Sequence, residues 1–102
     1  MSGKLNERKT LIIGGGGGIG GAIAHRFYSE GAHVAIVDAD ASSAERRGTE
    51  LLNAPGNGRV LTLGVDIGDP KTAKEVVESI SKELGGLDTT VHSAATREPT
   101  AT

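Results

Sequence analysis

The sequence contains no cysteine and no tryptophan, and Phe27 and Tyr28 are its only phenylalanine and tyrosine. Without cysteine the chain can form neither disulfide bonds nor thiolate metal sites, and thiol redox chemistry is excluded. With so few aromatic rings, a hydrophobic core has to be built from valine, isoleucine, leucine and alanine. Such cores are typical of parallel sheets that helices cover on both faces.

Excess charge and long apolar runs are also missing. The formal net charge is −2 at pH 7, and no basic patch with interleaved aromatic residues indicates a nucleic-acid surface. No apolar run approaches the length of a membrane span, and the polar start MSGKLNERKT lacks the apolar segment of a secretory signal. We therefore expect one cytoplasmic domain over residues 1–102, with 1–8 as a flexible lead-in, 96–102 as a truncated tail, and neither nucleic acid nor membrane as a partner.

Glycine, in contrast, is abundant, and five of the 16 glycines form an unbroken run over residues 14–18. The run lies between the apolar residues 11–13 and a helical pattern that opens with Ile19 and Gly20. A turn without Cβ atoms lets its backbone approach a ligand closely, and the N–H groups of the first helical turn point toward that ligand. These donors and the positive end of the helix dipole favour an anion. The stretch therefore predicts a binding site for nucleotide phosphate.

The remainder of the chain alternates between strand and helix patterns. Apolar runs predict strands over residues 10–13, 33–37, 59–65 and 88–93, and helical spacing predicts helices over 18–30, 41–53 and 70–84. We expect an α/β fold, a partial Rossmann-like doubly wound parallel sheet of about four strands in the order 3-2-1-4 with three helices.

Each predicted helix carries apolar residues that we expect to face the sheet. The expected contacts are Ile19, Ala22, Ile23 and Phe27 in the first helix, Leu51 and Leu52 in the second, and Ala73, Val76, Val77, Ile80 and Leu84 in the third.

The glycine run by itself is compatible with several sites. Gly15, Gly17 and Gly20 give the spacing G-x-G-x-x-G, whereas alternate glycines from Gly14 onward would also suit S-adenosylmethionine, and a plain flexible loop is a further alternative. A Walker-type phosphate loop is not indicated, because no Lys-Ser/Thr pair follows the glycines.

Two acids that follow predicted strands narrow the choice. Asp38 ends the second strand 24 residues after Gly14, where a carboxylate can accept hydrogen bonds from a ribose diol. The same charge repels a 2′-phosphate, so NAD is favoured over NADP. Asp66 follows the third strand and could bond an adenine amino group while Ile67 packs on the ring. For both acids a purely structural role in a cap or turn is the alternative, and Asp40 lies close to the first of them.

The three histidines do not suggest a metal site. His25 lies within a predicted helix, His33 begins a strand and His92 ends one, so the spacing of metal ligands is absent.

Taken together, the motifs resemble the N-terminal half of the short-chain dehydrogenase/reductase family over about residues 9–95. The resemblance rests on Gly14-x-x-x-Gly18-Ile19-Gly20, on Asp38, on Asp66-Ile67 and on Leu87-Asp88-x-x-Val91. It implies that Gly14, Gly18, Ile19 and Gly20 hold the pyrophosphate, that Asp38 binds the adenosine ribose, that Asp66 and Ile67 contact adenine, and that Ala94 lines the cofactor near its ribose groups.

The chain departs from the family pattern at three places. Ile13 stands where a threonine usually precedes the first glycine, and residues 92–95 read His-Ser-Ala-Ala in place of Asn-Asn-Ala-Gly. The family's catalytic serine and Tyr-x-x-x-Lys motif are absent, because the only tyrosine is Tyr28 and Ala32 follows it four residues later.

The resemblance implies an NAD(P)-dependent oxidoreductase that transfers hydride between a nicotinamide cofactor and an alcohol or carbonyl, with cofactor binding as the function of this part. The alternatives are a non-catalytic dinucleotide-sensing module and an S-adenosylmethionine-binding domain like that of methyltransferases. The fourth strand is expected to leave an open sheet edge, through which the chain would self-associate or take up a complementing segment.

Overall fold

A parallel sheet of four strands forms the centre of the computed structural model, which describes residues 6–14 and 17–93. The strands are β1 (Lys9–Ile13), β2 (His33–Asp38), β3 (Val60–Gly64) and β4 (Thr89–His92), and they lie in the order β3-β2-β1-β4. Leu11 of β1 is in register with Ala35 of β2 on one side and with Thr90 of β4 on the other. The predicted strand order 3-2-1-4 is confirmed.

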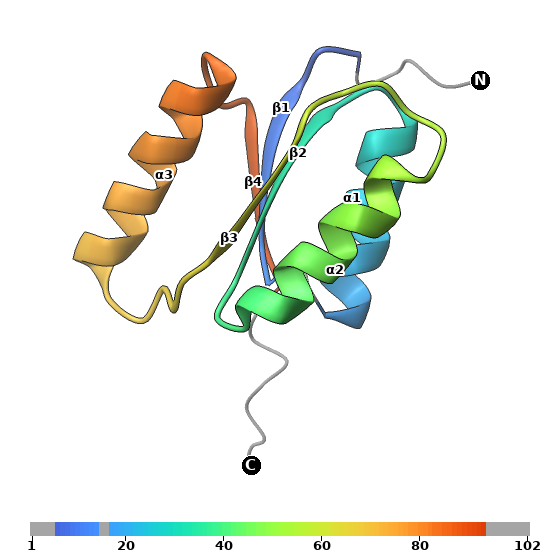
Figure 1. Ribbon diagram of the computed structural model, residues 1–102. Coiled ribbons are helices and arrows are strands. Elements are labelled where there is room, and N and C mark those ends of the chain that lie inside the picture. Colours follow the sequence, from blue (N-terminus) through green and yellow to red (C-terminus); the bar gives the residue numbers. More distant parts are fainter. Residues whose placement is uncertain (1–5, 15–16, 94–102) are drawn as a thin grey trace.

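Helices cover both faces of this sheet (Figure 1). The two helices α1 (Gly18–Ser29) and α2 (Ala41–Leu52) lie on one face, and α3 (Pro70–Leu84) lies on the other. Because side chains alternate along a strand, β1 supplies Ile12 to the core under α1 and α2, and Leu11 and Ile13 to the core under α3. The doubly wound α/β fold expected from the sequence is therefore confirmed.

The predicted ends of the elements agree with the observed ones to within a residue or so, because local signals fix them. The Asp69 carboxylate accepts from the Thr72 N–H at 2.8 Å and so caps α3, whose first residue is Pro70. Gly85 ends this helix in the left-handed conformation, with φ at 79°. Among the described residues, no helix has the length and apolar character needed to cross a membrane.

The buried face of α1 differs from the predicted one. The residues that α1 buries are Gly20, Gly21, Ala24 and Tyr28, whereas Ile19 is 61% exposed. At its start the helix turns small residues to the sheet, because this part lies directly against the turn that follows β1. Of the other predicted contacts, Ile23 and Phe27 pack against the core as expected, whereas Ala22 is exposed. A similar correction applies to α2, where Leu51 is fully buried but Leu52 is 63% exposed.

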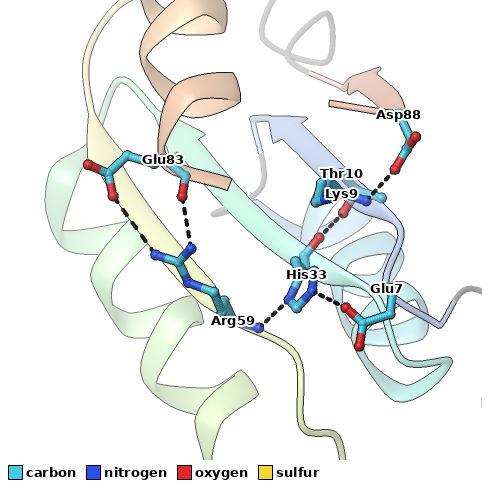
Figure 2. A network of polar contacts seen from close by, with 7 residues as sticks. All are labelled: Glu7, Lys9, Thr10, His33, Arg59, Glu83 and Asp88. Carbon is cyan, nitrogen blue, oxygen red and sulfur yellow. Dashed lines mark hydrogen bonds and ion pairs between the residues drawn. The ribbon is translucent and has the colours of Figure 1, made fainter. Parts of the chain in front are cut away.

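A network of polar contacts joins the amino ends of the strands (Figure 2). The Arg59 backbone N–H donates to Nδ1 of His33 at 2.8 Å, so the ring hydrogen lies on Nε2, which is 3.0 Å from the Glu7 carboxylate. The Thr10 hydroxyl donates to the His33 carbonyl at 2.7 Å. The His33 ring thereby ties the start of β3 to the start of β2.

The same end of the sheet also includes part of the expected lead-in. The His33 N–H donates to the Arg8 carbonyl at 2.7 Å, and the Glu7 N–H donates to the Gly31 carbonyl at 3.1 Å. Residues 7 and 8, which the sequence assigned to a flexible segment, are therefore hydrogen-bonded to the folded domain.

Candidate functional site

A cleft of roughly 340 Å³ opens where the carboxyl ends of the strands meet, at the lower edge of the sheet in Figure 1. From β1 the chain continues to β2 and β3 on one side and later reaches β4 on the other side, so this edge is a topological switch point, where open α/β sheets bind ligands. The cleft is lined by residues at the ends of the strands, in the loops that follow them and at the starts of α1 and α2, namely Ile13, Gly14, Gly17, Val37, Asp38, Ala39, Asp40, Ser43, Val65, Asp66, Ile67, His92 and Ser93.

The turn after β1 forms one wall of the cleft. Gly14 has a φ of 84°, in the left-handed region that favours glycine, and its N–H donates to the Val37 carbonyl at 2.6 Å. Gly17 is the N-cap of α1 and provides no side-chain hydrogen bond to the helix. The first turn of α1 thus begins beside the cleft with its backbone donors uncapped by any side chain.

Two glycines of this turn serve different purposes. A Cβ at position 20 would collide with the Gly14 carbonyl and lie 2.5 Å from the Ser93 hydroxyl oxygen, so Gly20 is required by packing. A Cβ at position 18 would meet no atom of the described residues within 4 Å, so packing within this part of the chain does not require Gly18.

Ser93 joins β4 to the glycine turn. Its N–H donates to the Ile13 carbonyl at 2.9 Å, and its hydroxyl lies 3.3 Å from that carbonyl and 3.2 Å from the carbonyl of Gly14. Although the chain lacks the asparagines typical of this position, the serine supplies hydrogen bonds that hold β4 against the turn.

Acidic side chains form another part of the cleft wall. Asp38 accepts from the Asp40 N–H at 3.0 Å, and Asp40 accepts in turn from the Ser42 N–H at 3.0 Å and from the Ser43 hydroxyl at 2.9 Å. The Ser43 hydroxyl, followed by the Ser43 N–H, lowers the pKa of the Asp40 carboxyl below its ordinary value. Together with Asp66, these carboxylates give the wall a negative charge.

The cleft brings together four of the eight residues that the sequence predicted as cofactor-binding, which are Gly14, Asp38, Asp66 and Ile67. The predicted residues Gly18, Ile19 and Gly20 follow Gly17 in the first turn of α1. Ala94 lies outside the described residues.

Sequence reasoning did not assign Ser43 to the site, because its contribution depends on the course of the loop after β2, for which residue spacing gives no signal. Ser93 is a direct neighbour of Ala94, and the resemblance to the family implies that Ala94 and its neighbours line the cofactor. His92, which ends β4, also lines the cleft. Within the described part of the chain, no group of three or more histidine or acidic side chains is arranged to hold a metal ion.

A profile of the family described as short chain dehydrogenase matches residues 8–102. The chain belongs to the short-chain dehydrogenase family. One of its curated relatives is the uncharacterized oxidoreductase YhxD of Bacillus subtilis, which is 43% identical over 89 residues, or 85% of this chain. Another is general stress protein 39 of the same organism, which is 36% identical over 96 residues, or 94% of this chain. The chain spans only 29% and 33% of the length of these two relatives.

Solved structures of short-chain dehydrogenases share the fold. A short chain dehydrogenase from Mycobacterium smegmatis gives a TM-score of 0.83 at 28% identity, and the match covers 90% of this chain and 38% of that one. The 3-ketoacyl-(acyl-carrier-protein) reductase from Brucella melitensis, solved with NADH, gives 0.74 at 33% identity, over 85% and 34% of the two chains. L-sorbose reductase from Gluconobacter frateurii, solved with NADPH and L-sorbose, gives 0.78 at 33% identity, over 88% and 34%.

These matches support the oxidoreductase hypothesis. They give no support to the alternatives of a dinucleotide-sensing module or an S-adenosylmethionine-binding domain.

Proposed function

We propose that this chain is the cofactor-binding part of a short-chain oxidoreductase and that it holds NAD in the cleft at the carboxyl edge of the sheet. The observation that carries the proposal is that residues of the glycine turn (Gly14 and Gly17) and Asp38 line one cleft. The whole enzyme would transfer hydride between the nicotinamide ring and an alcohol or carbonyl, with residues outside this chain providing the catalytic acid and the substrate pocket.

The pyrophosphate would bind at the start of α1. Backbone N–H groups of the first helical turn donate to phosphate oxygens, and the helix dipole favours the negative charge. Gly14 and Gly20 allow the turn to lie close to the helix start, and a phosphate group would take the space beside Gly18, where a Cβ meets no atom of the described residues within 4 Å. Ile19 is 61% exposed beside this position, and a bound cofactor would cover part of its side chain.

The adenosine would bind toward β2 and β3. Asp38 would accept hydrogen bonds from the ribose hydroxyls, Asp66 would bond the adenine amino group, and the partly buried Ile67 would pack against the ring. Ala94 would line the cofactor near its ribose groups, as the resemblance to the family implies.

The charge of the acidic wall favours NAD over NADP. A 2′-phosphate on the ribose would lie near the carboxylates of Asp38 and Asp40, which line the same cleft. The negative charges would repel one another, and the repulsion is strongest where water is partly excluded. The relatives solved with NADH and with NADPH indicate that the fold accepts either cofactor. The preference of this chain therefore depends on its own side chains at the end of β2.

Calorimetric titration of NAD and NADP into the wild type and into Asp38→Asn tests this function. We expect the wild type to prefer NAD, and we expect Asp38→Asn to weaken NAD binding and reduce the difference between the two cofactors. Glu78→Gln, an exposed acid on α3, is the matched control and should leave both affinities unchanged.

The outcomes separate the parts of the proposal. Equal affinity of the wild type for NAD and NADP would refute the proposed role of the acidic wall. Absence of binding to either dinucleotide would refute cofactor binding by this chain.

A further inference from the structure

Arg47 on α2 reaches across to the start of α1. Its Nη2 lies 3.5 Å from the Gly17 carbonyl oxygen, and its Nη1 donates to the Glu50 carboxylate at 2.6 Å. Only 24% of the Arg47 side chain is exposed. The guanidinium is thus held between two helices instead of extending into solvent.

The neighbouring helix leaves room for this side chain at Gly21. A Cβ at position 21 would collide with Nε of Arg47 and would lie 2.5 Å from the central guanidinium carbon. The glycine at this position therefore allows the guanidinium to pack directly on the backbone of α1.

Packing alone does not explain an arginine here. The Arg47 Nε is buried, and among the described residues it has no hydrogen-bond partner. A buried donor without a partner destabilises the folded state, and an uncharged side chain would fill the same space without that penalty. The contact with Gly17 gives the arginine another role.

Gly17 is the residue at which the glycine turn becomes a helix. Its carbonyl accepts the Gly21 N–H at 2.8 Å, its N–H donates to the Gly14 carbonyl at 3.3 Å, and it lines the cleft. A glycine backbone has more conformational freedom than any other, so an ordered turn requires contacts from outside it. Arg47 provides such a contact from α2.

We propose that Arg47 is a positioning residue that fixes the phosphate-binding turn from α2. The proposal rests on the cofactor-binding function proposed above. The start of α2 follows Asp38 and is capped by Asp40. Arg47 therefore links α2, at the ribose end of the site, to the turn at the pyrophosphate end. Its Nε is buried and does not reach the cofactor.

Binding measurements with three ligands test this role. In Arg47→Met we expect the affinities for NAD and ADP, which both contain a pyrophosphate, to fall roughly tenfold, the effect of losing about one charged hydrogen bond. The affinity for adenosine, followed by NMR titration, should remain that of the wild type. Arg46→Met removes the same charge from the adjacent exposed position and should leave all three affinities unchanged.

A second variant separates positioning from packing. In Gly21→Ala/Arg47→Met the new methyl group occupies space that the guanidinium has left, so this variant should melt at or above the midpoint of Arg47→Met. NAD affinity should stay reduced, because the contact with the Gly17 carbonyl is still missing. Recovery of affinity together with stability would mean that Arg47 only fills space, and would overturn the proposal.

Other outcomes identify which proposal fails. Wild-type NAD affinity in Arg47→Met would overturn the role of Arg47 and leave the cofactor site intact. A much larger loss for NADP than for NAD would assign the guanidinium to direct contact with a 2′-phosphate, which also overturns positioning. A wild-type chain that binds none of these ligands would overturn the proposed function itself.

Discussion

Gly20 and Gly18 belong to the same helical turn, yet alanine at each should have opposite effects on stability. At position 20 the added Cβ would collide with the Gly14 carbonyl and lie 2.5 Å from the Ser93 hydroxyl. Neither neighbour can move easily, because the Gly14 N–H donates to Val37 at 2.6 Å and the Ser93 N–H donates to Ile13 at 2.9 Å.

The expected cost follows from this packing. Forcing a methyl group into a filled site costs about 1–3 kcal/mol, and the helix preference of alanine over glycine returns at most about 1 kcal/mol. Because the Cβ would meet backbone atoms of Gly14, the packing cost should lie in the upper half of that range, about 2–3 kcal/mol, and we expect Gly20→Ala to lower the free energy of unfolding by about 1–2 kcal/mol. In a domain of this size that corresponds to a decrease in Tm of about 4–16 °C.

Gly18→Ala should behave differently, because a Cβ there meets no atom of the described residues within 4 Å. Its Tm should equal or exceed that of the wild type, owing to the higher helix propensity of alanine. Its affinity for NAD should nevertheless fall at least about tenfold, because the methyl group occupies the space proposed for a phosphate.

Thermal melts by circular dichroism and calorimetric titration with NAD, carried out on both variants, provide the test. A Gly20→Ala protein as stable as the wild type would show that α1 does not pack on the Gly14 turn as described. A Gly18→Ala protein that binds NAD as tightly as the wild type would show that the ligand does not approach this glycine.

Three further variants examine other parts of the molecule. Asp40→Ala removes the cap of α2 and should lower Tm at neutral pH. The folded state lowers the Asp40 pKa below its ordinary value of 3.8, so the stabilisation is present above that pH and is lost as pH falls through the lowered pKa. The Tm values of the wild type and the variant should therefore converge in acid. A difference that stays constant with pH would contradict the cap. His33→Leu leaves the Arg59 N–H without its acceptor and should lower the free energy of unfolding in urea by about 1–3 kcal/mol. The control His25→Leu, on the exposed side of α1, should lower it little. Equal effects of the two variants would rule out the ring contact. Thr90→Lys places a charge on β4, which among the described strands pairs only with β1, and should reduce any concentration-dependent association seen by light scattering, while unchanged association would exclude this edge as the interface.

Much of the fold was predictable from local patterns. Single elements can be identified from short stretches of sequence. Examples are the apolar run before the glycines, which predicts β1, and the Asp69-Pro70 start with the apolar stripe of Val76 and Ile80, which predicts α3. Short connections and right-handed crossovers then leave few arrangements for alternating strands and helices, so the order 3-2-1-4 followed.

The candidate site was predictable where a motif places residues at the ends of strands. Gly14, Asp38, Asp66 and Ile67 all line the cleft, because parallel strands end at the same edge of the sheet. The face of α1 was not predictable, since helical spacing favoured Ile19, whereas the close approach of the helix to the turn buries Gly20 and Gly21 instead.

The sequence by itself determined the alternation of elements, the strand order and the residues at the strand ends, because hydrophobic periodicity and turn chemistry act over a few residues. Only the tertiary structure decided how the glycines differ. The space that a side chain would take is occupied by Gly14 and Ser93 at position 20 and by Arg47 at position 21, whereas at position 18 no atom of the described residues occupies it. The reason is physical. A glycine in the sequence shows only that the residue has no side chain. Which group occupies the space beside it, whether backbone, an arginine or a ligand, depends on the residues packed around it.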